Sequence, residues 1–459
     1  MQKLFGKYDL TIKALLASLL LVVPLYPKFP FIRVPGTHVS IRLEDFLLAI
    51  TAAVLLIELL PRAREVFKRK IEGSMLLFLA VGMVSLLAAI FITDTASAQI
   101  GFLHWARRLE YFIPFFLAIS ATNKERKRIP EFVLKVSLIT IFFVFVYGVG
   151  QKHFSWPVII TQNEEYAKGV ALTHVHGGHL ISTFAGHYDL ASYLVLLMPI
   201  LVSALFLVKG RVSKSIIFVS SIFGLWLLAN SLSRISVASY LVGTTLALIF
   251  VNRAKVVPLV LIASLTVFGF SSSLLDRYIR VFEVARKNIG QVQVLPKNIY
   301  AQDSQDFVPQ RQKSATPTPA PVNIFEDRSA SIRLNVEWPR AIRALRKNPL
   351  LGTGYSSITL ATDNDYLRLL GEVGILGAFS FLLIISWFGR LALKAMPFAK
   401  HFKGIDLAFV GGFTGAFVGV LLNATFIDVF EASKFAITFW LFFGVTTALI
   451  RGAINEKNI

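Results

Sequence analysis

The stretch SIRLNVEWPRAIRALRKNPLLGTGYSSITLATDNDYLRLLGEVGILG, residues 331–377, closes a long polar interval in an otherwise apolar chain. The interval runs from about Asp276 to Gly371, and its second half is dense in Arg, aromatic and turn residues. On both sides of it, apolar runs of roughly twenty residues recur, each long enough to cross about 30 Å of hydrocarbon as a helix. This contrast predicts that the chemistry lies in the polar interval and that membrane helices hold it at one face of a bilayer.

The apolar runs predict an all-α, polytopic integral membrane protein with about twelve transmembrane helices. Of the 459 residues, 55% are hydrophobic and only 16% are charged. The spans are centred near residues 20, 52, 83, 111, 141, 198, 222, 243, 263, 380, 414 and 441. The fourth contains Arg107, Arg108 and Glu110, and charges inside a span usually pair with one another or face a cavity.

The formal net charge of +20 does not indicate nucleic-acid binding, because most basic residues lie in short connections between apolar runs. The clearest of these connections are PRAREVFKRK (61–70) and NKERKR (123–128), and such basic loops face the cytoplasm. We therefore expect both termini in the cytoplasm and the connections after spans five and nine outside. The basic, apolar N-terminal segment predicts a retained first helix rather than a cleaved signal. Because the chain has no cysteine, disulfides and thiolate metal sites are excluded.

Three parts follow from this topology. Residues 1–272 would form helices 1–9, residues 273–369 an extracytoplasmic loop between helices 9 and 10, and residues 370–459 helices 10–12. Within the loop, residues 289–327 are rich in Gln, Pro, Ala and Thr and predict a flexible insertion. Residues 329–369 would be partly helical and would carry the function.

A second outside loop lies near residues 151–188 and contains four histidines, His174, His176, His179 and His187. The spacing HxHxxH could bind a metal, but no carboxylate stands at a telling distance before Asp189. We favour polar side chains that line a cavity.

Two groups of arginines suggest phosphate binding. Arg234 interrupts the apolar run GLWLLANSLSRISVASYLVG (224–243), where its planar guanidinium could bind a lipid diphosphate or mark the membrane interface. Near-helical spacing of apolar residues after position 331 predicts an amphipathic helix with Arg333, Arg340, Arg343 and Arg346 between them. These arginines could bind phosphates or contact lipid headgroups.

The segment LATDNDYLRLLGEVGILG (360–377) offers two candidate general bases, Asp363 and Asp365, on either side of Asn364. A carboxylate here could take a proton from an attacking hydroxyl. The alternative is that Thr362 or Asp363 only caps the helix that follows. The glycines at 371, 374 and 377 predict close packing or a break where the chain re-enters the membrane.

Four local patterns resemble the O-antigen ligase and O-antigen polymerase superfamily over most of the chain. They are IRLEDFLLAI (41–50), STFAGHYDLASYLVLLMPI (182–200), SLSRISVASYLVG (231–243) and NPLLGTGYSSITLATDNDYLRLLGEVGILG (348–377). The last is similar to the family's closing signature of Gly-x-Gly, His-Asn, an aromatic-Leu pair, Glu and Gly-x-x-Gly. Two positions depart from the family: Asp363 stands where a His is the proposed base, and His179 where an Arg is common.

The resemblance implies a glycosyltransferase of the bacterial cytoplasmic membrane that takes a glycan from undecaprenyl diphosphate at the outer face, without metal or other cofactor. The acceptor hydroxyl would belong to a glycan, lipid or protein. Asp363 or Asp365, with Asn364, would act in catalysis, and the diphosphate would be bound by Arg234, Arg340, Arg343 and His179. His187, Asp189 and Tyr366 would line the cavity or the acceptor site.

Alternative functions remain at this point. A polysaccharide polymerase or a protein O-oligosaccharyltransferase of the same superfamily would differ from a ligase only in the acceptor. A polysaccharide transporter or flippase also suits about twelve spans, but we find no inverted repeat and few charges at mid-span.

Overall fold

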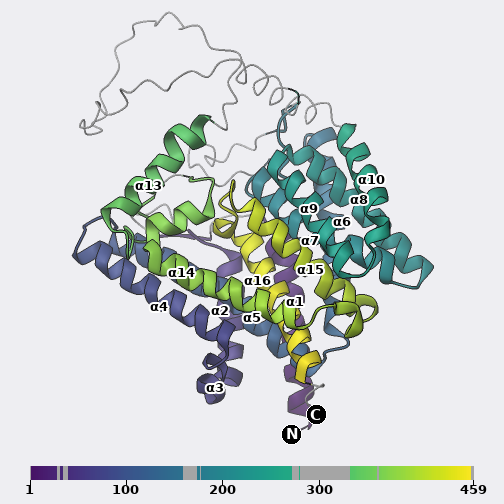
Figure 1. Ribbon diagram of the computed structural model, residues 1–459, viewed down its shortest axis with the longest axis horizontal. Coiled ribbons are helices and arrows are strands. Elements are labelled where there is room, and N and C mark those ends of the chain that lie inside the picture. The colour runs from purple at the N-terminus through teal and green to yellow at the C-terminus, as the bar shows by residue number, and fades with distance from the viewer. Residues whose placement is uncertain are drawn as a thin grey trace, which may run out of the picture.

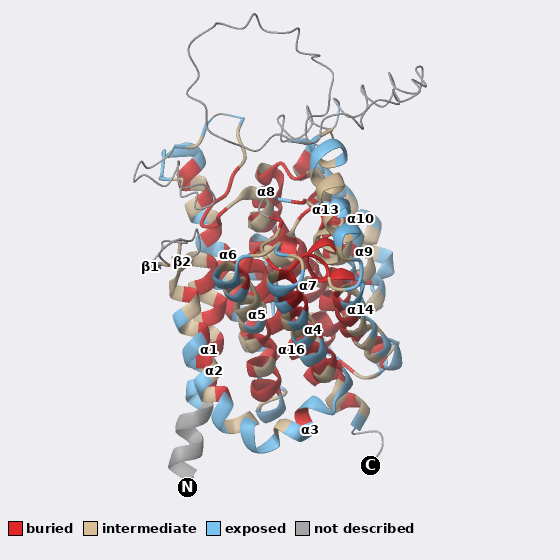
Figure 2. Ribbon diagram, turned by 90° about the vertical axis from the view of Figure 1, so that its left-hand side faces the viewer, coloured by how far each residue is buried: buried red, intermediate tan, exposed pale blue. Residues whose placement is uncertain are grey.

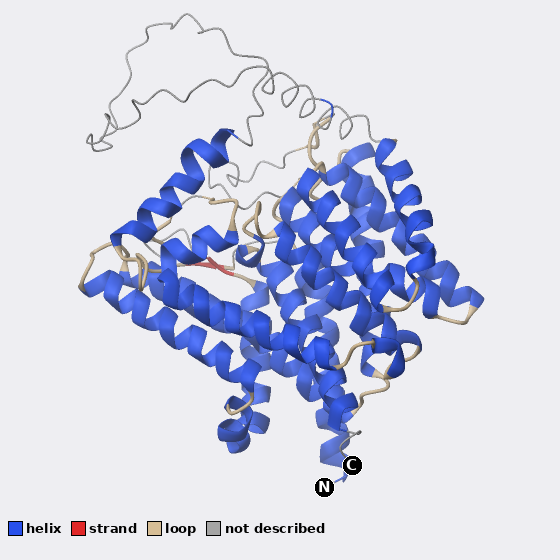
Figure 3. Ribbon diagram, viewed as in Figure 1, coloured by secondary structure: helices blue, strands red, loops and turns tan. Residues whose placement is uncertain are grey.

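The computed structural model describes residues 2–27, 31–34, 40–158, 173–175, 177–270, 279, 331–358 and 361–455. The described chain is a bundle of α-helices with one short strand pair (Figure 3). The predicted flexible insertion, 289–327, and His176 lie outside the described residues.

Each predicted span centre lies within a helix. Seven of the described helices are long and apolar enough to cross a membrane. The structure therefore supports a polytopic helical membrane protein, while the larger number of spans stays a prediction.

The first half of the bundle contains α1 to α6. The helices are α1 (Gln2–Leu25), α2 (Leu43–Leu59), α3 (Ala63–Phe67), α4 (Lys70–Phe91), α5 (Ala98–Lys124) and α6 (Ile129–His153), with a short 3-10 turn, η1 (Leu60–Arg62). Between α1 and α2, β1 (Ile32–Arg33) pairs antiparallel with β2 (Ser40–Ile41), Ile32 opposite Ile41. The N-terminus, the C-terminus and α3 lie at one end of the bundle (Figure 1).

The middle helices are α7 (His187–Leu207), α8 (Arg211–Ser231), α9 (Arg234–Phe250), the turn η2 (Ala254–Val256) and α10 (Val257–Gly269). Leu232 has a left-handed backbone, φ 58° and ψ 22°, which ends α8 and turns the chain sharply into α9. The predicted Ser-Arg segment thus forms a tight helix–helix corner.

The last part contains the π-helical turn η3 (Arg333–Glu337), α13 (Trp338–Lys347), α14 (Asp365–Lys394), η4 (Phe398–Lys400), α15 (Gly404–Asn423), η5 (Val429–Glu431) and α16 (Ser433–Asn455). The predicted amphipathic helix is confirmed as η3 and α13. Pro339, the second residue of α13, directly follows the π-helical turn η3.

The predicted break at the glycines is confirmed within α14, where Gly374 has φ 68° and ψ −170°. The turn at residues 349–354 fills the break. Thr353 N–H donates to the Gly371 carbonyl at 3.0 Å, and Gly354 N–H donates to the Glu372 carbonyl at 2.8 Å. The turn therefore satisfies carbonyl groups that an unbroken helix would satisfy itself.

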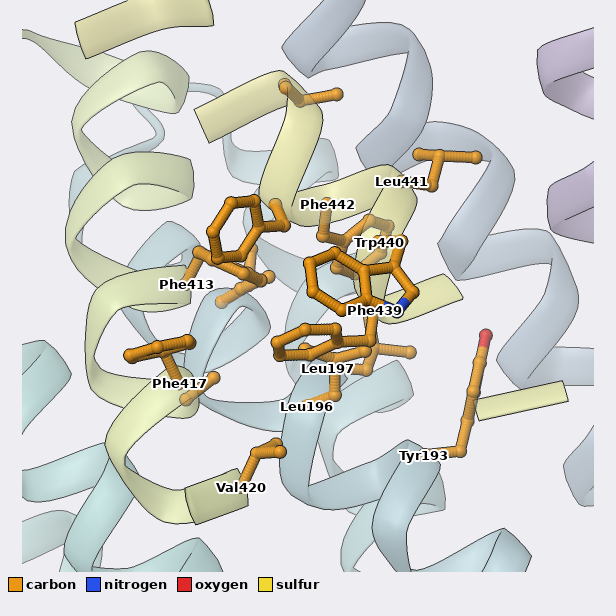
Figure 4. Close-up of a cluster of buried hydrophobic side chains, with 14 of the residues drawn as sticks. Tyr193, Leu196, Leu197, Phe413, Phe417, Val420, Phe439, Trp440, Leu441 and Phe442 are labelled. Atoms are coloured by element: carbon orange, nitrogen blue, oxygen red, sulfur yellow. The ribbon is translucent and has the colours of Figure 1, made fainter. Parts of the chain in front are cut away.

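The core lies between α7, α15 and α16, and α7 and α16 are buried along most of their length. Figure 4 shows Phe413 and Phe417 of α15 facing Phe439 and Trp440 of α16. The rings of Phe417 and Phe439 stack 6.1 Å apart, and such aromatic pairs add about 0.5–1.5 kcal/mol to their burial. By contrast, only about half of the residues of α4, α6 and α8 are buried, as expected for helices at the lipid-facing surface (Figure 2).

A buried lysine ties three segments to this core. The ammonium of Lys434, in the first turn of α16, donates to the carbonyl oxygens of Pro24 at 3.1 Å, Tyr26 at 2.8 Å and Thr183 at 2.6 Å. Because a buried charge is tolerated only when it is well hydrogen-bonded, these carbonyls must stay in place. The end of α1 and the segment before α7 are thereby fixed to the start of α16.

Candidate active site

Asp363 lies at the centre of the candidate site, in the short turn before α14. Its backbone is left-handed, with φ 49°, a conformation that Asp adopts more readily than most residues. Arg333 of η3 donates to Asp363 Oδ2 from Nε at 3.0 Å and from Nη2 at 2.7 Å. Among the described residues, Oδ1 has no hydrogen-bond partner, and the side chain is 20% exposed. One carboxylate oxygen is therefore held and the other can meet a substrate.

Asp428, in the connection between α15 and η5, holds the backbone on both sides of Asp363. Its Oδ2 accepts from the Thr362 N–H at 2.8 Å, and its Oδ1 accepts from the Asn364 N–H at 2.9 Å. Arg368 of α14 also donates to Asp428 Oδ2, at 2.9 Å. These charge-assisted bonds fix the turn that presents Asp363.

Asn364 is the N-cap of α14, since its Oδ1 accepts from the Leu367 N–H at 2.9 Å. The interpretation that Thr362 or Asp363 caps this helix is wrong, because Asn364 occupies the cap and Asp363 turns toward Arg333. The catalytic role predicted for Asn364 stays a prediction.

Asp365 is directed into the protein, unlike Asp363. Its Oδ2 accepts from the N–H groups of Val429 at 2.7 Å and Phe430 at 3.2 Å. Of the two predicted candidate bases, Asp365 thus joins the start of α14 to η5 and lines a cavity of only about 60 Å³. Asp363 differs because its side chain is 20% exposed and its Oδ1 has no hydrogen-bond partner among the described residues.

Neighbouring aromatic side chains and Arg333 connect the second predicted outside loop, near residues 151–188, to Asp363. His179 and His187 stack with their ring centroids 3.9 Å apart, and His187 lies 4.0 Å from the Tyr188 ring. Arg333 Nη2 donates to the Tyr188 hydroxyl at 3.1 Å. The structure therefore brings His179 and His187 into one cluster with Arg333 and Asp363. Asp189 follows in the same first turn of α7.

Arg234 begins α9 at the same end of the bundle. His179 Nδ1 lies 3.2 Å from the carbonyl oxygen of Ser231, three residues before Arg234. Ser236, two residues after it, donates to Asn423 Oδ1 at 3.0 Å. The next residue along, Ala424, accepts from the Asp365 N–H. The starts of α9 and α14 are thus joined through the end of α15.

The arginines of α13 differ in their surroundings. Arg340 has a buried Nη1 with no hydrogen-bond partner among the described residues. Oε2 of the neighbouring Glu337 is also buried and has no such partner. Arg343 is exposed. Buried polar atoms without partners are costly, so these two atoms mark a place where a polar ligand would be stabilised.

Behind the turn lies a charged network that reaches α5. Arg108 donates to the Phe430 carbonyl at 2.9 Å and forms an ion pair with Glu431, which also lies 3.5 Å from Arg368 Nε. Two alternatives were expected for charges in the fourth span, pairing with one another or facing a cavity. Arg108 lines a cavity, and its ion-pair partner Glu431 lies in η5, outside that span. These side chains line a cavity of about 60 Å³ with Asp365 and Tyr366. The cavity has room for a few water molecules, whereas ligand sites are typically about 300–1,000 Å³.

Tyr366 also packs inward, because its hydroxyl donates to the Leu421 carbonyl at 2.8 Å. Its predicted place beside the acceptor stays a prediction.

Three carboxyl groups of the site differ in pKa. Burial raises the pKa of Asp363, and Arg333 partly offsets this increase. Burial, with the nearby charge of Asp363, raises the pKa of Glu337 to about 7. Burial also acts to raise the pKa of Glu431, but Arg108 and Arg368 outweigh it and hold the value at about 2. The site therefore contains two carboxyl groups that accept a proton more readily than usual and one that stays ionised.

Sequence reasoning did not single out Arg333 from the other arginines of its helix, and it missed Tyr188, Glu337 and Asp428. A usable signal for Arg333 was its position at the start of the Arg-rich stretch, one helical turn before Glu337. Asp428 offered none, because its partners lie sixty or more residues earlier in the chain.

Residues 216–382 match the protein-family model described as O-antigen ligase. The match covers Arg234, Arg333 and Asp363 and ends within α14, before Asp428. A search of the curated proteins found no match. The described part of the chain is a polytopic helical membrane protein, and its segment 216–382 is similar to the O-antigen ligase family.

Proposed function

We propose that this protein is a glycosyltransferase that moves a glycan from undecaprenyl diphosphate to an acceptor hydroxyl at the outer face of the cytoplasmic membrane. The observation that carries the proposal is the Arg333–Asp363 pair, in which one oxygen of Asp363 has no partner among the described residues and Glu337 of η3 lies nearby with an unpartnered Oε2. The match to the O-antigen ligase family supports the class of reaction.

Asp363 would act as the general base. The acceptor oxygen attacks the anomeric carbon of the donor sugar, its proton passes to Asp363 Oδ1, and the bond from that carbon to the diphosphate oxygen breaks. A base is most effective when its pKa lies near the working pH, and burial moves the pKa of Asp363 in that direction. Arg333 would keep the carboxylate aimed at the acceptor, as a positioning residue.

The leaving diphosphate gains negative charge, and arginine guanidinium groups would stabilise it. Arg340 offers Nη1, which no described residue hydrogen-bonds, Arg343 is exposed three residues later, and Arg234 lies at the same end of the bundle. Preplaced guanidinium groups bind phosphates through two parallel hydrogen bonds and need no reorganisation during the reaction. His179 would approach the donor from the α7 side. On this mechanism turnover is independent of added metal.

The two departures from the family pattern fit one arrangement. Asp363 stands in place of the family's His and pairs with Arg333, while His179 reaches the same cluster through His187 and Tyr188. The role of general base would thus belong to Asp363, and the phosphate contacts to the arginines and His179 of the same site.

The decisive experiment follows an undecaprenyl-diphosphate-linked oligosaccharide with the purified protein in lipid and EDTA present. We expect release of undecaprenyl diphosphate in step with a transferred or extended glycan. The mass of the product separates a ligase from a polymerase or a protein O-oligosaccharyltransferase.

Asp363→Asn should lower the rate at least about a hundredfold, the usual contribution of a general base, while the protein stays folded. Asp94→Asn is the matched control, since Asp94 also has a left-handed backbone, is exposed and has no proposed role. Turnover of Asp363→Asn at the wild-type rate would remove the assignment. Movement of the glycan across the bilayer without bond breakage would indicate a transporter instead.

A further inference from the structure

A cationic groove lies at the opposite end of α14 from Asp363. The groove has a volume of about 490 Å³ and is formed where the start of α4, the end of α14 and the end of α16 meet. Figure 1 shows α4 and α14 running side by side, with α3 at the end that carries the groove. Five of its side chains are cationic, namely Arg69, Lys70, Arg390, Lys394 and Arg451.

Only one of these charges is neutralised within the described residues. Arg451 forms a two-bond ion pair with Glu72, whose side chain is 1% exposed, at 2.5 and 2.7 Å. Arg69, Lys70, Arg390 and Lys394 form no ion pair with any described carboxylate. Four positive charges therefore face one groove without a counterion from the part of the chain that the structure describes.

Trp387 holds two of these charges in place. Lys70 Nζ lies 4.1 Å from the centroid of its ring, and Arg390 Cζ lies 4.6 Å from it. Each cation gains from the ring, but the two repel each other. Both residues line the groove together with Lys394, so an anion bound in the groove would offset the repulsion among these cations.

The surroundings favour a phosphate that carries acyl chains. Ile71 and Leu391 line the groove between the cations. Along the same two helices, Leu393 is 66% exposed and Leu382 is 49% exposed on α14, and Leu77 of α4 is 43% exposed. Apolar surface of this kind in a membrane protein faces lipid tails, and basic pockets between membrane helices bind anionic headgroups.

We infer that this groove binds the headgroup of an anionic phospholipid from the leaflet at this end of the bundle. The headgroup phosphate contacts Arg390, Lys394 and Lys70, and the acyl chains run along α4 and α14. The inference does not depend on the proposed transferase activity.

The test uses the purified full-length chain in a neutral detergent, titrated with phosphatidylglycerol and followed by native mass spectrometry. The double variant Arg390→Gln/Lys394→Gln should weaken binding at least about tenfold, since each basic residue near an anionic headgroup contributes appreciably. The matched control is Arg253→Gln/Lys255→Gln, which removes two exposed charges between α9 and α10. It should bind like the wild type.

Parallel titrations distinguish the sources of phosphate. Phosphatidylcholine and inorganic phosphate should each bind at least tenfold more weakly than phosphatidylglycerol. Equal binding of inorganic phosphate would identify a soluble-anion site, and equal binding of phosphatidylcholine or equal loss in both double variants would indicate general surface adhesion; each result would overturn the inference. If the groove variant does not fold, Trp387→Phe replaces it and should weaken binding severalfold by loosening both cations.

Discussion

At the scale of single residues, two carboxylates separated by one residue do different things. Asp363 keeps an open oxygen beside Arg333, whereas Asp365 accepts two backbone N–H groups of η5. The difference comes from Asn364, which takes the cap position and leaves its neighbours on opposite sides of the chain. Similar residue types therefore divide into a site residue and a structural one.

Asp365→Ala should lower thermal stability while folded protein still turns over. The substitution leaves the N–H groups of Val429 and Phe430 without a partner, and each unsatisfied buried group costs about 1–3 kcal/mol. The measurement is the melting temperature in detergent, with the rate per folded molecule determined below it. An unchanged melting temperature together with lost turnover would mean that Asp365, and not Asp363, is the general base.

The raised pKa of Glu337 predicts how the Michaelis constant for the donor depends on pH. With its pKa raised to about 7, Glu337 is neutral below that pH and negative above it. Its charge would then oppose an anionic donor, and an interaction of about 1 kcal/mol corresponds to roughly fivefold in affinity. The Michaelis constant of the wild type should therefore rise about fivefold between pH 6 and pH 8.

Glu337→Gln keeps the shape of the neutral acid, so its Michaelis constant should stay near the pH 6 value throughout. The rate constant at saturating donor serves as the control, because it reports the base rather than donor binding. If variant and wild type follow the same pH curve, Glu337 does not face the donor.

At the scale of elements, the break in α14 at Gly374 determines how the turn at residues 349–354 packs against the bundle. A Cβ on Gly374 would lie 2.3 Å from the Leu350 carbonyl oxygen, and the backbone of Gly374 is one that only glycine adopts readily. Gly374→Ala should therefore destabilise the fold by at least about 2 kcal/mol, measured as a lower melting temperature.

Gly389→Ala is the matched control on the same helix, because an added Cβ there meets no atom within 4 Å. Alanine is favoured over glycine inside helices, so this variant should melt at or slightly above the wild-type temperature. Equal losses in both variants would mean that α14 simply tolerates no alanine, and the break would have no special role.

The helices also show how much of the fold could be predicted from the sequence. The helices around residues 141, 198 and 414 were predictable, because each is an apolar run whose length is sufficient for a membrane-spanning helix. The break at the glycines was also predictable from composition.

The site was predicted only where its residues lie close together in sequence. Asp363 and its neighbours were singled out, but Arg333, Asp428 and Glu431 acquire their roles from partners brought together by packing. An ion pair between Arg108 and Glu431 joins residues that are more than three hundred positions apart, and no local pattern encodes it.

At the scale of the whole molecule, the two ends of the bundle have different chemistry. One end carries the Asp363 cluster, and the other carries the termini, α3 and the cationic groove. Basic residues that concentrate at one end of a helical bundle orient it in the membrane. The distribution therefore predicts that the groove end is cytoplasmic and that the site faces outward, where a lipid-linked donor would be met.

This orientation can be tested with single cysteines, because the natural chain has none and each introduced thiol is the only one present. Arg346→Cys lies on α13 near the site, and Lys68→Cys lies just after α3 at the groove end; both side chains are exposed. In cells whose cytoplasmic membrane is intact and accessible from outside, a membrane-impermeant maleimide should label Arg346→Cys at once. Lys68→Cys should react only after permeabilisation. Labelling in the reverse order would invert the bundle, place Asp363 in the cytoplasm and rule out transfer at the outer face, whereas the chemistry assigned to the Arg333–Asp363 pair would still have to be judged by turnover.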